Sequence, residues 1–213
     1  SIQKIGDYAF KNCTSIEKVK FESPSKLRSI GRQAFNMCIL LKKINLPSSL
    51  NSIGEEAFGG CSSLTKIKIS SKIKSIEKRT FCGCSSMSEI SFEHPSSVVS
   101  IEESALNGCR SLVWISIPSS VSMISKNAFY NCSSMSEISF EPKSSLNEIG
   151  DFAFCECSLV KQVEIPSSVK KIGKKCFAPN TKIIKNSSFY MIILCCISVV
   201  IMILVVFFFI KIN

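Results

Sequence analysis

The stretch Ile53–Cys61, which reads IGEEAFGGC, recurs in outline along this chain of 213 residues. Its skeleton is Ile-x-x-x-Ala-Phe-x-x-Cys. Other copies begin at Ile5, Ile30, Ile76, Ile101, Ile124 and Ile149, and a degenerate copy begins at Ile172. Successive copies are 23 or 25 residues apart. A period of this length is typical of a solenoid, because each unit is too small to bury its apolar face alone.

The residues that follow each copy alternate in the manner of a β-strand. In Leu64-Thr65-Lys66-Ile67-Lys68-Ile69, the isoleucines are expected to point inward while Lys66 and Lys68 face solvent. The whole pattern predicts an α/β-type leucine-rich-repeat solenoid over residues 1–184, with seven full units and a degenerate eighth. We expect a parallel sheet on its concave face and a short helical or irregular turn around Ala57 and Phe58.

Two residues of the skeleton are expected to form ladders inside the stack. The phenylalanines should pack as an internal spine, with Leu106 replacing Phe in the fifth unit; they are Phe10, Phe35, Phe58, Phe81, Phe129, Phe154 and Phe177. Seven cysteines share one repeat position: Cys13, Cys38, Cys61, Cys84, Cys109, Cys132 and Cys157. We expect buried free thiols, because each rung has two equivalent neighbours and no reason to pair with either; disulfides and a metal site are the alternatives.

The 25-residue units differ from the others by two extra residues at one turn. An insertion at a turn leaves the strands in register and bulges outward. We therefore expect ridges along one edge of the solenoid, with Glu93, His94 and Glu141 as exposed loop positions.

The end of the chain has a different composition from the repeats. Residues 189–210 are almost entirely apolar, and 22 residues at about 1.5 Å each give roughly 33 Å, enough to cross a bilayer as one helix. The sequence therefore predicts a juxtamembrane linker at 185–188, a transmembrane helix at 189–210 and a short tail at 211–213. The chain also starts in mid-repeat, so we expect that it lacks sequence upstream.

The amino-acid composition limits the classes of function that this protein can have. The formal net charge is +10, which suits acidic partners in general. A single histidine, with no glycine-rich phosphate loop and no carboxylate cluster, leaves no candidate catalytic, cofactor-binding or metal-binding residue. We expect a protein that is not an enzyme, has no cofactor and takes no small-molecule substrate. We also expect no nucleic-acid partner.

The outward positions of the predicted strands are the candidate binding residues. The first three units place lysines there, whereas later units place neutral or acidic residues. The single tryptophan, Trp114, lies near the middle of this surface, and exposed tryptophan is enriched at interaction sites. The candidates for binding a protein or an acidic glycan are Lys18, Lys20, Lys43, Lys66, Lys68 and Trp114. The alternative is that the lysines only keep the sheet from pairing with another chain.

The repeat unit resembles that of the BspA-like, or Treponema-type, leucine-rich-repeat proteins. Their unit reads Leu-x-x-Ile-x-Ile-Pro-x-x-Val-x-x-Ile-Gly-x-x-Ala-Phe-x-x-Cys, which residues 112–132 nearly match. The resemblance covers residues 1 to about 184. It implies a solenoid whose relatives are often cell-surface proteins that bind host or matrix proteins, some of them with a terminal membrane segment. It also implies that the family has no shared catalytic residues. Leu106 departs from the pattern, as do Glu77 and Glu102 at positions where glycine is usual.

Two placements of the repeats relative to a membrane remain open. Six lysines between 170 and 185 precede the predicted span, and the positive-inside rule would put them in the cytoplasm. Abundant cysteine also favours a cytosolic, tail-anchored scaffold for protein–protein interactions. The family resemblance favours an adhesin or receptor in the plasma membrane with extracellular repeats, since folded domains behind a signal peptide escape the charge rule. We expect the surface placement.

Overall fold

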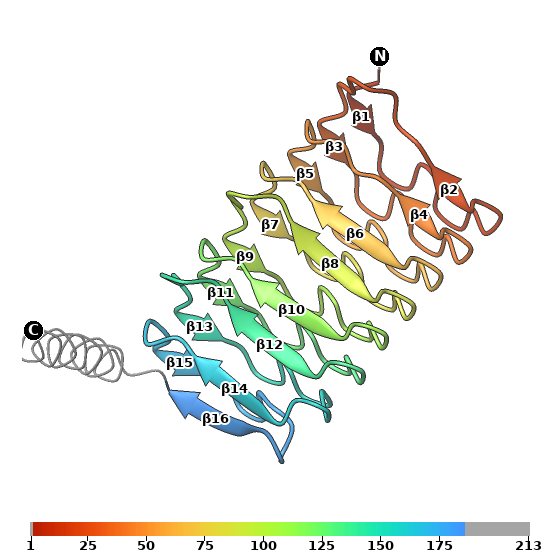
Figure 1. Ribbon diagram of the computed structural model, residues 1–213. Helices are drawn as coiled ribbons and strands as arrows, with labels where there is room; N and C mark the ends of the chain where they lie inside the picture. The colour runs from red at the N-terminus through yellow and green to blue at the C-terminus, as the bar shows by residue number, and fades with distance from the viewer. Residues whose placement is uncertain (1, 186–213) are drawn as a thin grey trace, which may run out of the picture.

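The computed structural model describes residues 2–185, which wind into an elongated stack of coils (Figure 1). Each coil contributes one strand to each of two rows. The first row holds two-residue strands: β1 (Lys4–Ile5), β3 (Ser29–Ile30), β5 (Ser52–Ile53), β7 (Ser75–Ile76), β9 (Ser100–Ile101), β11 (Met123–Ile124), β13 (Glu148–Ile149) and β15 (Lys171–Ile172). The second row holds β2 (Lys18–Val19), β4 (Lys43–Ile44), β6 (Lys66–Ile69), β8 (Glu89–Phe92), β10 (Trp114–Ile117), β12 (Glu137–Phe140), β14 (Gln162–Ile165) and β16 (Lys182–Lys185).

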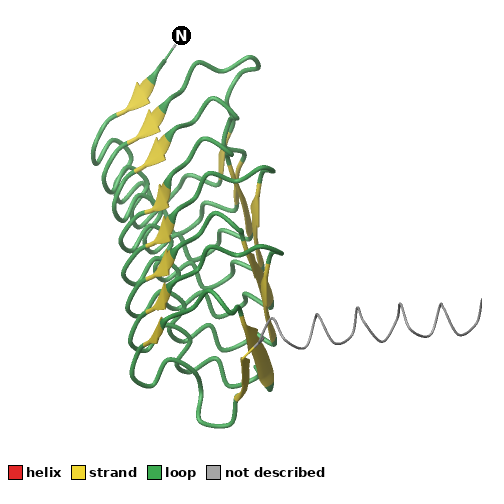
Figure 2. Ribbon diagram, turned by 90° about the vertical axis from the view of Figure 1, so that its left-hand side faces the viewer, coloured by secondary structure: helices red, strands yellow, loops and turns green. Residues whose placement is uncertain are grey.

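The two rows lie on different sides of the stack (Figure 2). All recorded strand pairs are parallel, as expected when a chain winds repeatedly in one direction. The first row forms the sheets β1-β3-β5 and β15-β13-β11-β9-β7, and the second row forms the pairs β2-β4, β6-β8, β10-β12 and β14-β16. Equivalent residues of successive units pair directly, for example Ile67 with Ile90. The parallel solenoid predicted from the repeat is confirmed.

The turn around Ala57 and Phe58 takes the irregular form of the two that were expected, helical or irregular, because residues 2–185 contain no helix. The predicted α/β class is therefore wrong for the part of the chain that the structure describes. The residue three positions after each repeat isoleucine has a positive φ, as at Glu56 (φ 55°). Every second backbone N–H group of the turn also donates its hydrogen bond to the next coil. Ala57 donates to the Gly54 carbonyl in the same turn, whereas Phe58 donates to the Thr80 carbonyl in the next coil. A helix needs its N–H groups bonded within itself, so this pattern builds stacked turns instead.

The phenylalanine spine is present, and it is buried from Phe35 onward, whereas Phe10 in the first coil is exposed. Phe10, Phe35, Phe58 and Phe81 stack with ring centroids 5.1, 5.4 and 5.6 Å apart. Beyond Leu106, the stack of Phe129, Phe154 and Phe177 has spacings of 4.8 and 5.4 Å. Leu106 fills the gap between the two runs and is itself buried. The spine and its isoleucine and leucine neighbours make one continuous core along the stack.

The cysteine ladder is buried from Cys38 onward, while Cys13 in the first coil is half-buried. The sulfurs are free thiols. Each buried thiol donates to a backbone carbonyl of the preceding coil; the pairs are Cys38 to Phe10, Cys61 to Phe35, Cys84 to Phe58, Cys109 to Phe81, Cys132 to Leu106 and Cys157 to Phe129, at 3.0–3.4 Å. Burial raises the pKa of Cys38, Cys61, Cys84, Cys109 and Cys132, that of Cys61 to about 12. The ladder therefore joins coils without covalent bonds.

The expected ridges differ from the prediction in one respect. His94 is exposed, but Glu93 and Glu141 are partly buried. Their carboxylates turn back onto the neighbouring turn, where Glu93 accepts from the Ser71 N–H at 3.2 Å and Glu141 accepts from the Ser119 N–H at 2.9 Å. These glutamates accept hydrogen bonds from turn N–H groups, so the prediction that they are exposed loop positions is wrong.

The last described strand, β16, pairs with β14 and carries the stack to Lys185, one residue past the predicted boundary. Within residues 2–185, no helix has the length and apolar character needed to cross a membrane. The predicted transmembrane helix at 189–210 and the tail at 211–213 lie outside the described residues, as do residues 186–188 of the predicted linker.

Candidate binding face

The outward side chains of the second row from β2 to β14, excluding the last strand β16, form a surface that we call the long-strand face. Along the stack these residues are Lys18, Lys20, Lys43, Asn45, Lys66, Lys68, Glu89, Ser91, Trp114, Ser116, Glu137, Ser139, Gln162 and Glu164. In β6 the isoleucines are buried and Lys66 and Lys68 are exposed, which confirms the predicted alternation. The face divides into two halves of opposite character.

The basic half begins with Lys18, Lys20 and Lys43, which the first coils bring together. All three are exposed, and none forms an ion pair with another described residue. With Val19, Phe21 and Asn45 they line a shallow hollow of about 210 Å³. Uncompensated ammonium groups around one depression attract an acidic ligand, most strongly at low ionic strength.

Lys66 and Lys68, which the sequence suggested as part of the same site, already have acidic partners. Lys66 Nζ lies 2.7 Å from the carboxylate of Glu89, and Lys68 Nζ lies 3.7 Å from that of Glu93. Both lysines are well exposed, so these pairs are weak and a ligand can compete for them. They extend the basic half but are less available than Lys18, Lys20 and Lys43. The pairing follows from the register, since Lys66 and Glu89 are one repeat apart.

Trp114 lies apart from the lysines. It is the first residue of β10, and β8 lies between β10 and β6 (Figure 1). The exposed fraction of Trp114 is 43%. Its register partner on β12 is Glu137. The structure therefore does not bring Trp114 into the basic cluster, and the tryptophan belongs to the other half of the face.

Sequence reasoning missed a second basic hollow in the same first three coils. It has a volume of about 410 Å³ and is lined by Gln3, Ser25, Lys26, Arg28, Ser49, Asn51 and Lys72. The cations Lys26, Arg28 and Lys72 form no ion pair with another described residue. They come from turns and from positions just before the short strands, so the strand pattern did not point to them. A comparison of equivalent positions one repeat apart would have brought Arg28 and Asn51 together.

The turns that carry the skeleton make a third surface, with a charge pattern that was also missed. The residue two positions after each repeat isoleucine alternates in sign through eight coils: Asp7, Arg32, Glu55, Lys78, Glu103, Lys126, Asp151 and Lys174. We call this set the turn-edge row. Neighbouring members contact one another, with Arg32 Nε 3.8 Å from Glu55 and Lys78 Nζ 3.2 Å from Glu103.

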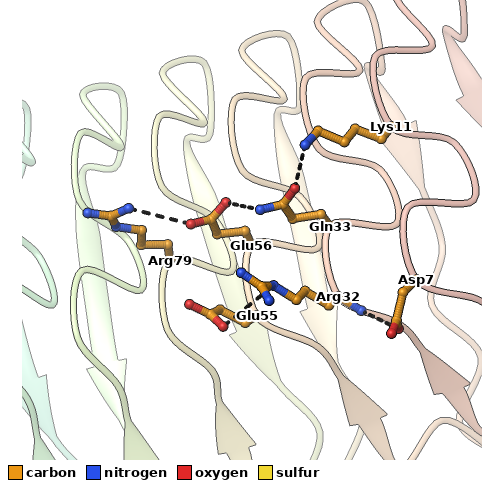
Figure 3. Close-up of polar contacts among 7 residues, drawn as sticks. All are labelled: Asp7, Lys11, Arg32, Gln33, Glu55, Glu56 and Arg79. Atoms are coloured by element: carbon orange, nitrogen blue, oxygen red, sulfur yellow. Dashed lines mark hydrogen bonds and ion pairs between the residues drawn. The ribbon is translucent and has the colours of Figure 1, made fainter.

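A parallel set of contacts runs beside the turn-edge row (Figure 3). Lys11 donates to Gln33 at 2.7 Å, Gln33 donates to Glu56 at 2.6 Å, and Arg79 Nη1 lies 3.5 Å from the other oxygen of Glu56. Asp7 accepts from the backbone N–H of Arg32 at 2.9 Å. Because these groups bind one another from coil to coil, this surface supports the stack and is a poor candidate for ligand binding.

The described residues contain no group of three or more side chains arranged to hold a metal ion. His94, the chain's one histidine, is exposed, and its Nδ1 lies 3.5 Å from Glu141. Burial raises the pKa of the ladder thiols Cys61 and Cys109, which makes these two thiols poor nucleophiles. These groups supply no candidate catalytic site in the part of the chain that the structure describes.

A sequence model described as the BspA type leucine rich repeat region matches residues 3–94 and 90–191. No curated protein sequence matches the chain. Among solved structures, it is similar to a leucine rich cell surface protein from Faecalibacterium prausnitzii, with 28% identity and a TM-score of 0.64. That match covers 88% of this chain and 59% of the other.

A leucine-rich repeat protein from Bacteroides ovatus is also similar, with 30% identity, a TM-score of 0.69, and coverage of 79% of this chain and 45% of the other. The Treponema pallidum leucine rich repeat protein shares the fold at 24% identity and a TM-score of 0.55, over 75% of this chain and 72% of the other. The chain thus spans about half the length of the first two of these proteins.

Proposed function

Because the chain belongs to the BspA-type leucine-rich-repeat family, we propose that it is a non-enzymatic binding protein, anchored in the membrane and exposed at the cell surface. Its similarity to a cell surface protein from Faecalibacterium prausnitzii supports this placement. The apolar run 189–210 follows the last strand of the solenoid after three residues and would supply the single-pass anchor.

The observation that carries the proposal is the uncompensated basic hollow of Lys18, Lys20 and Lys43. Its ligand would be acidic, either an acidic segment of a protein or an acidic glycan of a host or matrix. Lys66 and Lys68 lie next along the same face and would exchange Glu89 and Glu93 for the ligand's anionic groups. The hollow of Lys26, Arg28 and Lys72 adds positive potential to the same coils.

The test compares two triple variants of the 213-residue chain, both kept in a nonionic detergent. Lys18→Ser, Lys20→Ser and Lys43→Ser remove the hollow's charges, whereas Lys126→Ser, Lys161→Ser and Lys170→Ser remove the same net charge from other surfaces. We expect the first triple to weaken binding to immobilised heparin, or to a glutamate-rich peptide, by about tenfold or more, because three ion contacts are lost. The second triple should bind within about threefold of the wild type. Equal losses would mean that only net charge matters and would overturn the proposal.

A second function is supported by the free thiols and the lysines near the predicted span. Ten described cysteines are unpaired, and Lys170, Lys171 and Lys174 precede the apolar run. Both features suit a tail-anchored scaffold whose repeats lie in the cytosol. Protease treatment of intact cells separates the two functions. Surface exposure predicts that the repeats are lost from an immunoblot, and full protection would favour the scaffold.

A further inference from the structure

The second half of the long-strand face has the opposite charge from the first. The outward residues of β8, β10, β12 and β14 include the carboxylates of Glu89, Glu137 and Glu164, and these strands contain no lysine or arginine. The strands β2, β4 and β6 carry lysines at the equivalent positions. The long-strand face therefore changes sign at the boundary between β6 and β8, and Trp114 lies within the acidic half. Beyond β14, this half adjoins β16, where Lys182 is the register partner of Gln162.

Carboxylates flank Trp114 in both directions along the stack. Glu137 is its direct partner in the parallel pair β10-β12, and Glu89 holds the equivalent position on β8, where it is the register partner of Lys66. Trp114 therefore lies between two acidic positions along the stack, Glu137 on the paired strand about 4.8 Å away and Glu89 on the preceding strand of the row.

The two glutamates differ in their availability. Glu89 accepts from Lys66 at 2.7 Å. Glu137 is exposed and has no ion-pair partner within residues 2–185. Glu164, two coils beyond Trp114, is likewise exposed and without an ion-pair partner in the described part of the chain. The acidic half thus presents an open aromatic ring with uncompensated carboxylates on one side of it.

This combination fits a cation better than an anion or an apolar group. A guanidinium or ammonium group is attracted to the face of an indole, and a carboxylate beside the ring adds a charge-assisted hydrogen bond. Arginine satisfies both contacts at once, because its planar group stacks on the ring while its N–H groups reach the carboxylate. The surrounding outward residues are Ser91, Ser116 and Ser139, so no apolar wall surrounds the ring.

We propose that Trp114, Glu137 and Glu164 form a second binding site, which takes an arginine- or lysine-bearing segment of a protein partner. This site goes beyond the acid-binding function of the basic half, because it uses other residues and a ligand of the opposite charge. Together the two halves make a bipolar face, which a partner with an acidic and a basic patch would engage in only one orientation.

Trp114 reports directly on its own site, since the chain has no other tryptophan. Hexa-arginine is titrated into the 213-residue chain in a nonionic detergent while indole fluorescence is followed, and hexaglutamate and a glycine–serine peptide serve as controls. We expect a saturable change in emission with hexa-arginine alone. We expect Glu137→Gln to weaken the apparent affinity by about fivefold, and Trp114→Leu, measured by calorimetry, to weaken it at least as much.

Glu156→Gln is the matched control, because Glu156 is exposed on the turn surface and its substitution removes the same charge. It should leave the affinity for hexa-arginine within about twofold of the wild type. Absence of a fluorescence change, or equal weakening by Glu156→Gln and Glu137→Gln, would overturn the proposal. The triple Lys18→Ser, Lys20→Ser and Lys43→Ser should bind hexa-arginine at least as tightly as the wild type while losing heparin, so either site can fail independently of the other.

Discussion

The thiol of Cys84 lies 3.2 Å from the carbonyl oxygen of Phe58, and its Sγ–H donates to that oxygen across the boundary between two coils. Five other cysteines make the same contact, each with the preceding coil. The neighbouring Cys82 is only half-buried and makes no such bond to a described residue. One repeat position therefore supplies both a small apolar group and a bond between coils.

The contrast between Cys84 and Cys82 gives a stability prediction. Cys84→Ala should lower the free energy of unfolding by about 1–3 kcal/mol, because it leaves a small cavity and removes one of the two hydrogen bonds that the Phe58 carbonyl accepts, the other coming from the Cys61 N–H. Cys82→Ala, two residues away, should change it by less than about 0.5 kcal/mol. Urea unfolding followed by circular dichroism measures both. Equal effects would show that the inter-coil bond contributes nothing.

The phenylalanine spine makes a second prediction at Leu106. This residue is buried between Phe81 and Phe129, at a position where other units place Phe. Leu106→Phe should join the two stacked runs and raise the free energy of unfolding by about 1 kcal/mol. Phe81→Ala should lower it by about 3–5 kcal/mol. A destabilising Leu106→Phe in thermal unfolding would mean that the fifth coil is packed around leucine and cannot take the ring.

Alkaline pH should weaken the fold through the buried thiols. Burial raises the pKa of Cys61 from 9.0 to about 12, so the unfolded chain loses this proton first. The stability due to the neutral thiol is complete below pH 9.0 and is lost as the pH rises towards 12. We expect the free energy of unfolding to fall by on the order of 1 kcal/mol per pH unit within this window for this thiol. Cys61→Ala should show a shallower decline in urea titrations above pH 9.0; an identical slope would contradict the assignment.

The alternating turn-edge row predicts a salt-dependent effect. Glu103→Lys places a cation between Lys78 and Lys126, replacing an attraction by two repulsions. It should cost about 1 kcal/mol of stability at low salt and much less in about 1 M sodium chloride, since these side chains are partly exposed. Glu103→Gln should cost less than the reversal. If salt leaves the difference between the two variants unchanged, the row does not act through charge.

Particular residues show how far the sequence alone predicts this molecule. The period, the alternation of Lys66 and Ile67, and the spine from Phe10 to Phe81 could be predicted because each depends on spacing within the chain. The helical turn could not be excluded, because the hydrogen bond from Phe58 to Thr80 exists only once two coils are stacked.

The candidate site was predicted less completely, for the same physical reason. The exposure of Lys18 and Trp114 follows from strand alternation, but the pairing of Lys66 with Glu89 depends on the register between coils. The same register separates Trp114 from the lysines and places it beside Glu137. The sequence predicts an exposed loop position for Glu93, because nothing near Glu93 along the chain shows that the Ser71 N–H lies within reach.

The central claim is that the first coils bind an acidic ligand through Lys18, Lys20 and Lys43, and lysine footprinting tests it most directly. The chain is acetylated with an amine-reactive reagent in the presence and absence of heparin, and each lysine is quantified by mass spectrometry. We predict that heparin protects Lys18, Lys20 and Lys43 and leaves Lys161 and Lys170 as reactive as before. Protection that is spread evenly over the chain's lysines, or confined to Lys161 and Lys170, would contradict the claim.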